Sequence, residues 1–111
     1  MSGPTTILTP FETNVIVGTS AMINAVPANP TRKALIISNN GPNTETVNVT
    51  FGAINPGAVS PPNLPSATTG IPIVGGSSFS LFPYASSDIS MGAQLNMIAS
   101  AAATPVSVLE F

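Results

Sequence analysis

Residues 46–52 alternate between polar and apolar side chains, and this alternation limits the fold more than any other feature of the sequence. Val47, Val49 and Phe51 would share one face of a strand, with polar side chains on the other face. A period of two over this length is typical of a strand with one buried face. Residues 32–41 form a second, largely apolar segment, and a loop rich in Asn, Gly and Pro follows it. The sequence therefore predicts two antiparallel strands joined by a short loop.

Similar short apolar segments recur along the chain, separated by Pro, Gly, Asn and Ser. The 12 prolines and 9 glycines among 111 residues leave no helix of useful length. Residues 91–103 contain good helix formers, but the alternation of Leu95, Met97 and Ala99 favours a strand. About eight short strands predict an all-β fold, a single antiparallel β-sandwich or jelly roll. The remaining strands are expected at 14–17, 21–26, 71–74, 78–81, 94–99 and 106–110.

The length predicts one domain, which we place at residues 14–111, after an extended N-terminal arm at residues 1–13. Prolines interrupt the arm, and its apolar residues are too sparse for a core of their own. Residues 53–70 are the longest irregular stretch, where recurrent prolines disfavour ladder pairing. Apolar side chains in such segments gain by burial against a neighbour. We therefore expect assembly contacts at Ile7, Leu8, Phe11, Ile54, Val59 and Leu64.

The chain carries very little charge, with two cations and four carboxylates. Charged residues are 5% of the sequence, against about 25% in an ordinary soluble domain. Solubility then depends on Ser, Thr and Asn, which suits a protein that works in an assembly. Two cations cannot neutralise a run of phosphates, so no nucleic-acid partner is expected. We expect no membrane contact and no export by the general route, because the sequence shows no basic amphipathic stretch and no signal segment.

Residue types that carry most enzyme chemistry are missing from the sequence. It contains no His and no Cys, which removes the commonest general base, the usual zinc ligands and the thiol nucleophile. Lys33 is interpreted as a strand-start lysine, and Gly75-Gly76 as a hairpin turn because the Walker lysine is absent. We expect no enzyme activity, no metal or other cofactor and no small-molecule substrate.

Arg32 stands at the start of an apolar strand in a chain nearly without cations. Two interpretations remain open: a salt bridge to Glu110 or Asp88, or an ordinary arginine at the edge of a sheet. A buried pair would fix strand register more than it would add stability.

The order of motifs over residues 29–111 resembles a group of small virion proteins of tailed bacteriophages. That group includes jelly-roll decoration (cement) proteins of the capsid and small head- or tail-fibre domains. The resemblance is carried by Pro30-Thr31-Arg32, Leu35-Ile36-Ile37, Asn39-Asn40-Gly41, the Val-x-Val-x-Phe-Gly run of 47–52, Gly70 to Gly76 and Val106 to Glu110.

The resemblance implies a structural virion protein, made in the host cytoplasm and located on the capsid surface. A cement protein of this kind binds the outside of the phage head and stabilises contacts between major capsid subunits. It is often a homotrimer, so the implied partners are the major capsid protein and further copies of this chain. The alternative is a head- or tail-fibre module that binds a host surface receptor, for which an exposed cluster of Phe82 and Tyr84 would be the sign.

Overall fold

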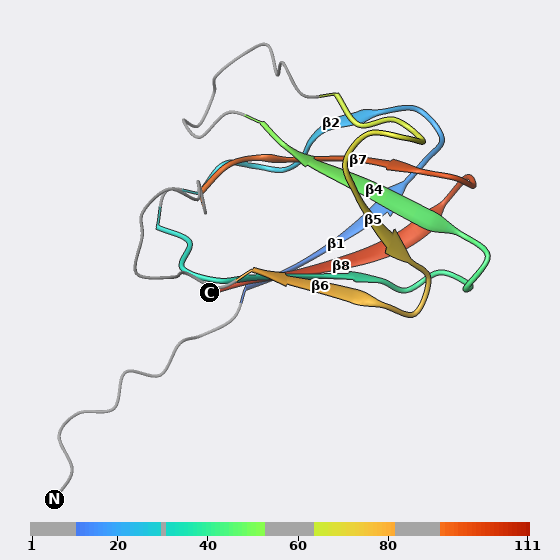
Figure 1. Cartoon of the computed structure of the whole chain (residues 1–111). Coiled ribbons are helices and arrows are strands. Elements are labelled where there is room, and N and C mark those ends of the chain that lie inside the picture. Colours follow the sequence, from blue (N-terminus) through green and yellow to red (C-terminus); the bar gives the residue numbers. More distant parts are fainter. Residues whose placement is uncertain (1–10, 30, 53–63, 82–91) are drawn as a thin grey trace, which may run out of the picture.

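The computed structural model describes residues 11–29, 31–52, 64–81 and 92–111. These residues form eight β-strands and no helix (Figure 1). All strand pairs are antiparallel. The strands are β1 (Phe11–Val17), β2 (Met22–Val26), β3 (Leu35–Asn39), β4 (Thr46–Phe51), β5 (Ile71–Val74), β6 (Ser78–Leu81), β7 (Leu95–Ala99) and β8 (Thr104–Glu110).

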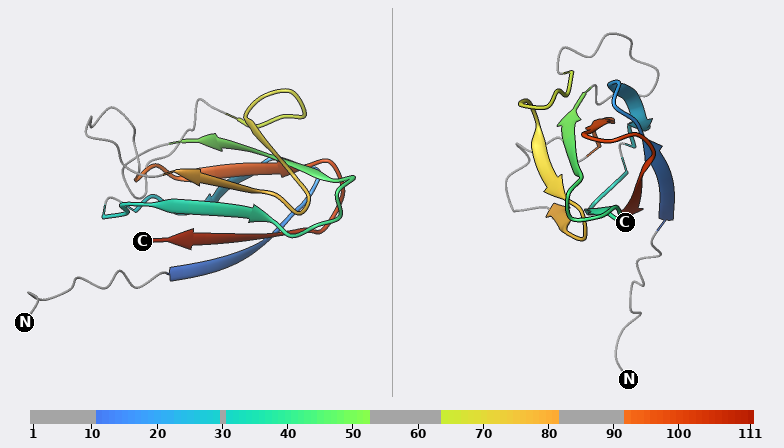
Figure 2. Two further views of the ribbon diagram at one scale, coloured as in Figure 1. Left: turned by 60° about the horizontal axis from the view of Figure 1, so that its bottom comes forward. Right: turned by 90° about the vertical axis from the view of Figure 1, so that its right-hand side faces the viewer.

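The strands lie in two four-stranded sheets that face each other (Figure 2). Sheet A has the order β1-β8-β3-β6, and sheet B has the order β2-β7-β4-β5. Along the chain, most connections cross from one sheet to the other, which is the double-sheet arrangement of a jelly roll. The predicted all-β sandwich of about eight strands is therefore confirmed, including a strand rather than a helix at Leu95–Ala99.

The predicted pairing of the strands on either side of loop 40–45 is wrong. β3 belongs to sheet A and β4 to sheet B, so the loop crosses the sandwich instead of closing a hairpin. The Gly75-Gly76 turn likewise joins β5 of sheet B to β6 of sheet A. Facing sheets are about 10 Å apart, a gap that a few extended residues can span. Turn chemistry predicts where the chain reverses, but it does not distinguish a hairpin from a crossing.

Two strands begin earlier than the sequence predicted. β1 starts at Phe11, so residues 11–13 pair with β8 and do not belong to the expected arm. β8 starts at Thr104, where it pairs with Val17. In β8 the added residues continue the alternation of buried and half-buried side chains, and Thr104 is fully buried. In β1 the added Phe11 and Glu12 are both exposed.

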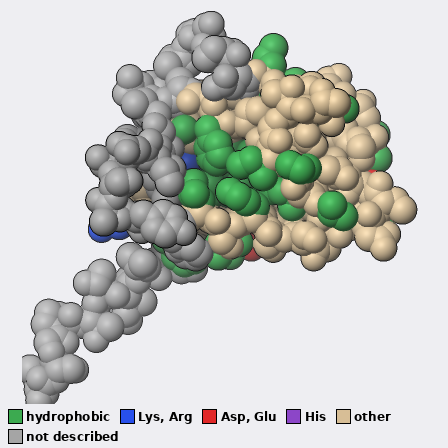
Figure 3. Space-filling view, in the orientation of Figure 1, with side chains coloured by type: hydrophobic (Ala, Val, Ile, Leu, Met, Phe, Trp, Pro, Cys, Tyr) green, Lys and Arg blue, Asp and Glu red, His purple; other side chains and the backbone are tan. Residues whose placement is uncertain are grey.

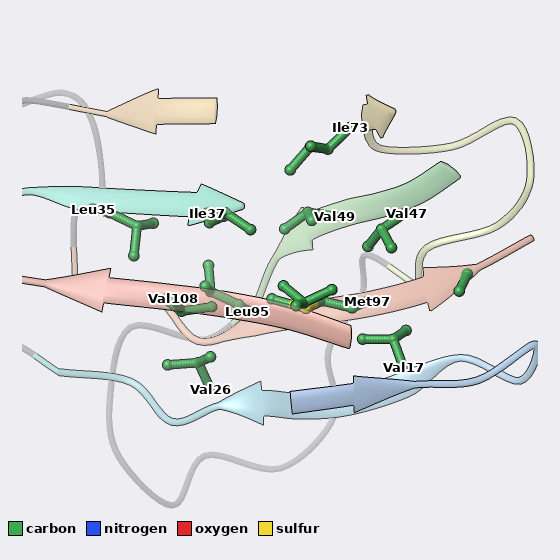
Figure 4. Packing of buried hydrophobic residues seen from close by; sticks show 12 residues of the cluster. Val17, Val26, Leu35, Ile37, Val47, Val49, Ile73, Leu95, Met97 and Val108 are labelled. Carbon is green, nitrogen blue, oxygen red and sulfur yellow. The ribbon is translucent and has the colours of Figure 1, made fainter. Parts of the chain in front are cut away.

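The core lies between the sheets and is built from inward-facing side chains of both (Figure 4). Val47 and Val49 are buried in it, as their alternation predicted. The opposite face of β4 is also covered, since Asn48 and Thr50 are 7% and 8% exposed. The Asn48 amide donates to the Thr69 carbonyl at 3.4 Å. The prediction of one buried face was thus incomplete. The core residues are Val17, Val26, Leu35, Ile37, Val47, Val49, Ile73, Leu95, Met97, Ala99, Val106 and Val108.

The loop between β3 and β4 packs against the turn between β5 and β6. The Gly75 amide donates to the Glu45 carbonyl at 2.8 Å. A Cβ placed on Gly75 would lie 1.8 Å from the Pro42 carbonyl oxygen, a backbone atom that cannot move without displacing the loop. Asn39 joins the same contact, because its amide donates to the Ile73 carbonyl at 2.8 Å. This end of the sandwich therefore has room for glycine alone at position 75.

Gly75→Ala should destabilise the protein by about 1–3 kcal/mol or more, because the added methyl overlaps the Pro42 carbonyl. Gly18→Ala is the matched control, since a Cβ there meets nothing within 4 Å. Its effect should stay within about 0.5 kcal/mol. The free energies of unfolding come from urea titrations followed by circular dichroism. Equal losses in the two variants would contradict the packing described here.

Candidate interaction surfaces

The six predicted assembly contacts divide between described and undescribed parts of the chain. Phe11 and Leu64 lie in the described part and are 66% and 55% exposed. Such exposure is compatible with a contact role, but the described residues include no partner for either side chain, so the role stays a prediction. The other four, Ile7, Leu8, Ile54 and Val59, lie outside the described residues.

Arg32 is buried at one end of the sandwich, with its side chain fully enclosed. Its Nε donates to Glu110 Oε1 at 2.7 Å, which confirms the salt bridge to Glu110. The guanidinium also donates to the carbonyls of Ala93 at 2.8 Å and Pro27 at 3.1 Å. Glu110 ends β8 of sheet A, whereas Pro27 follows β2 and Ala93 precedes β7 of sheet B. Arg32 therefore links the two sheets and is a structural residue.

Glu110→Gln should destabilise the protein by about 3–5 kcal/mol, because Arg32 would keep its charge in a buried site without a counter-charge. Glu12→Gln removes the same charge from an exposed position on β1 and should change stability by less than about 0.5 kcal/mol. Urea titrations at neutral pH measure both variants. If the two carboxylates prove equally dispensable, the ion pair does not hold the sheets together.

An apolar seam runs along the side of the molecule where β5 and β6 are the edge strands. We define it by Ile71 of β5 and by Phe79 and Leu81 of β6. Phe79 and Leu81 pack against the core, yet they remain half-buried, and so does Ile71, which pairs with the core residue Val49. Figure 3 shows hydrophobic side chains gathered on the face that bears these two strands. The core is thus incompletely covered along this side.

The outer face of sheet A carries an uncharged polar row. Asn40 Nδ2 donates to Ser107 Oγ at 2.7 Å, and Ser107 Oγ donates to Asn14 Oδ1 at 2.9 Å. Ser38 and Ser78 share a hydroxyl hydrogen bond of 2.9 Å. The row extends over β1, β8, β3 and β6. Hydroxyls and amides therefore provide the water contacts that charged residues provide in most domains, and they are cheaper to desolvate.

A groove of about 530 Å³ lies on sheet B. Its lining residues belong to segments far apart in the sequence, which is why sequence reasoning did not find it. They carry hydroxyl, amide and aliphatic groups and no charge, so the groove offers hydrogen bonds but no acid or base. The lining consists of Thr19, Thr46, Asn48, Ala67, Pro72, Ile98, Ala99 and Ser100.

Within the described part of the chain, no group of three or more His, Cys, Asp or Glu residues is arranged to hold a metal ion. The same residues contain no helix of the length and apolarity needed to cross a membrane. Phe82, Tyr84 and Asp88 lie outside the described residues, and so does any aromatic cluster or ion pair built on them.

The fold is similar to that of a chain from Bacillus endospore appendages, which are described as a novel family of disulfide-linked pili. The two chains are 14% identical, with a TM-score of 0.52, over 93% of this chain and 84% of the other. At this identity the likeness establishes a shared fold. No protein-family model matches the sequence, and no curated protein matches it either.

Proposed function

We propose that this chain is a structural virion protein, a decoration protein that binds the outside of a phage head and stabilises contacts between major capsid subunits. The observation that carries the proposal is the apolar seam on β5 and β6, where core side chains are left half-buried. A partner that covers the seam would complete the core on this side.

Burial of the seam would supply a binding free energy suited to reversible attachment to a capsid shell of repeated subunits. Fully burying one large apolar side chain is worth about 1.5–3 kcal/mol. The seam residues are already partly covered, so each gains a fraction of that amount and together they contribute a few kcal/mol. Binding of this strength becomes firm when many copies act on one lattice.

The sequence motifs and the low charge support the same role. Residues 29–111 resemble jelly-roll decoration proteins, and these proteins act by mechanical contact and not by chemistry. With charged residues at 5% of the chain, a docking surface can form without stripping water from many ions. The polar row on sheet A keeps the free subunit hydrated on another face.

A fibre subunit is the second candidate, and the similarity to a chain from pili favours it. Both roles require repeated contacts between β-sandwiches. A disulfide linkage such as that of the pili is not available here, because the 111 residues contain no cysteine. A fibre built from this chain would depend on non-covalent contacts. A head- or tail-fibre module that binds a host receptor belongs to the same class.

The copy number of this chain in purified virus particles separates the candidates. Quantitative mass spectrometry would compare it with the copy number of the major capsid protein. A number in fixed proportion to the capsid lattice supports the decoration role, whereas a few copies per particle support a fibre. Absence from the particles contradicts both virion roles.

Ile71→Glu should weaken shell binding about tenfold, equivalent to ~1.4 kcal/mol, because it places a charge in the apolar seam. Ser80→Glu adds the same charge to an exposed position of β6 outside the seam and is the control. The measurement is the occupancy of shells that lack this protein when purified variants are added. Equal occupancy for both variants would place the contact elsewhere.

A further inference from the structure

The four edge strands of the sandwich differ in how well they are protected against pairing with another strand. An edge strand has unpaired amides and carbonyls, and proteins block such edges with proline, bulges or short length. β5 has four residues, and Pro72 is exposed within it. β6 also has only four residues. β2 is interrupted by a register shift between Met22 and Val26, and Asn24 within that stretch has a φ of 59°.

β1 has none of these protections. It is seven residues long and pairs with β8 in unbroken register from Phe11 to Val17. It contains no proline and no lysine, and its only charged residue is Glu12. Figure 2 shows it as the outermost strand of sheet A. Phe11 and Ile16 are 66% and 59% exposed, so the strand presents both free backbone groups and uncovered apolar side chains.

We propose that β1 pairs antiparallel with β1 of a second copy of this chain, across a twofold axis at Asn14. A strand that adds to β1 must itself have an unprotected edge. Among the four edge strands that the structure describes, β1 alone meets that condition, so its partner in a second copy is β1. The two A sheets then join into one continuous sheet. This inference goes beyond the proposed function and does not depend on it.

The register follows from the length of the strand. Asn14 is the midpoint of Phe11–Val17, so a twofold axis there pairs all seven residues of each copy. Glu12 of one copy then lies opposite Ile16 of the other, and its methylene groups can cover that side chain. The two Glu12 carboxylates are four residues apart along the strand, about 13 Å, where salt screens them. A parallel pair in register would place them side by side.

The contact is small. Each copy contributes the seven residues of β1, whereas a stable interface has about 20–30 residues on each side. We therefore expect weak, concentration-dependent dimers in free solution, and firmer pairing where an assembly holds copies close together. A twofold contact also differs from the trimer that the resemblance implies, so the symmetry itself can be tested.

Single-cysteine variants test the register, because the natural chain has no cysteine that could react instead. Asn14, Glu12 and Ile16 are all exposed positions of β1. Each is replaced by Cys in turn, and the full-length variants are oxidised with copper phenanthroline at high protein concentration. Asn14→Cys should form a disulfide-linked dimer readily, because residue 14 meets its own copy at the axis. Glu12→Cys and Ile16→Cys should cross-link poorly alone and well when combined in one chain.

Ser80→Cys is the control for random collision, since it is exposed on β6, the opposite edge of the same sheet. Equal cross-linking at Ser80 and Asn14 overturns the proposal, and so does a lack of cross-linking at every β1 position. The circular dichroism of each reduced variant shows that the fold is retained.

A second measurement does not depend on cysteine. Ile16→Lys places a charge on the β1 edge, whereas Ile23→Lys places one on the interrupted edge of β2, where isoleucine is 40% exposed. In sedimentation equilibrium the natural chain and Ile23→Lys should form dimers with similar constants, and Ile16→Lys should stay monomeric at least tenfold higher in concentration. A natural chain that is trimeric, or an association that Ile16→Lys leaves unchanged, contradicts pairing through β1.

Discussion

The rest of the sandwich depends on the enclosed guanidinium of Arg32. A buried charge is costly unless it is paired and fully hydrogen-bonded, and Arg32 meets that demand with Glu110 of sheet A and two carbonyls beside sheet B. The ends of β8 and β2 and the start of β7 are thereby fixed relative to one another. At the opposite end of the sandwich, uncharged donors link the two sheets, chiefly the side-chain amide of Asn39 and the backbone amide of Gly75.

The two long sides of the sandwich, between these linked ends, differ in what they expose. On one side β5 lies near β6, and the apolar seam exposes part of the core. On the other side β1 lies near β2, and β1 has an unprotected edge. The two proposed contacts therefore use opposite sides of one molecule. A copy could bind a shell through the seam and a neighbouring copy through β1 without competition, which is what a protein that ties a lattice together requires.

The candidate surfaces were only partly foreseeable from the sequence. Phe11 was expected as an exposed contact residue, but it belongs to β1 and not to an arm, because pairing with Glu110 extends the strand. The polar row and the groove on sheet B were not foreseeable, since Asn14, Ser107 and Asn40 come from distant segments that only sheet order brings together. Phe79 is likewise half-buried because β6 is an edge strand. The alternation of polar and apolar residues in the sequence does not show which strands lie at the edge of a sheet.

The sequence alone determined the strands, because a period of two and the positions of Pro and Gly are local properties of the chain. It also limited the chemistry, since residue types that are missing cannot be supplied by folding. The tertiary structure decided which strands pair, because a reversal at loop 40–45 or at Gly75 can either close a hairpin or cross the sandwich. It also decided which of the two readings of Arg32 holds, since a salt bridge needs two distant side chains to be buried at one point.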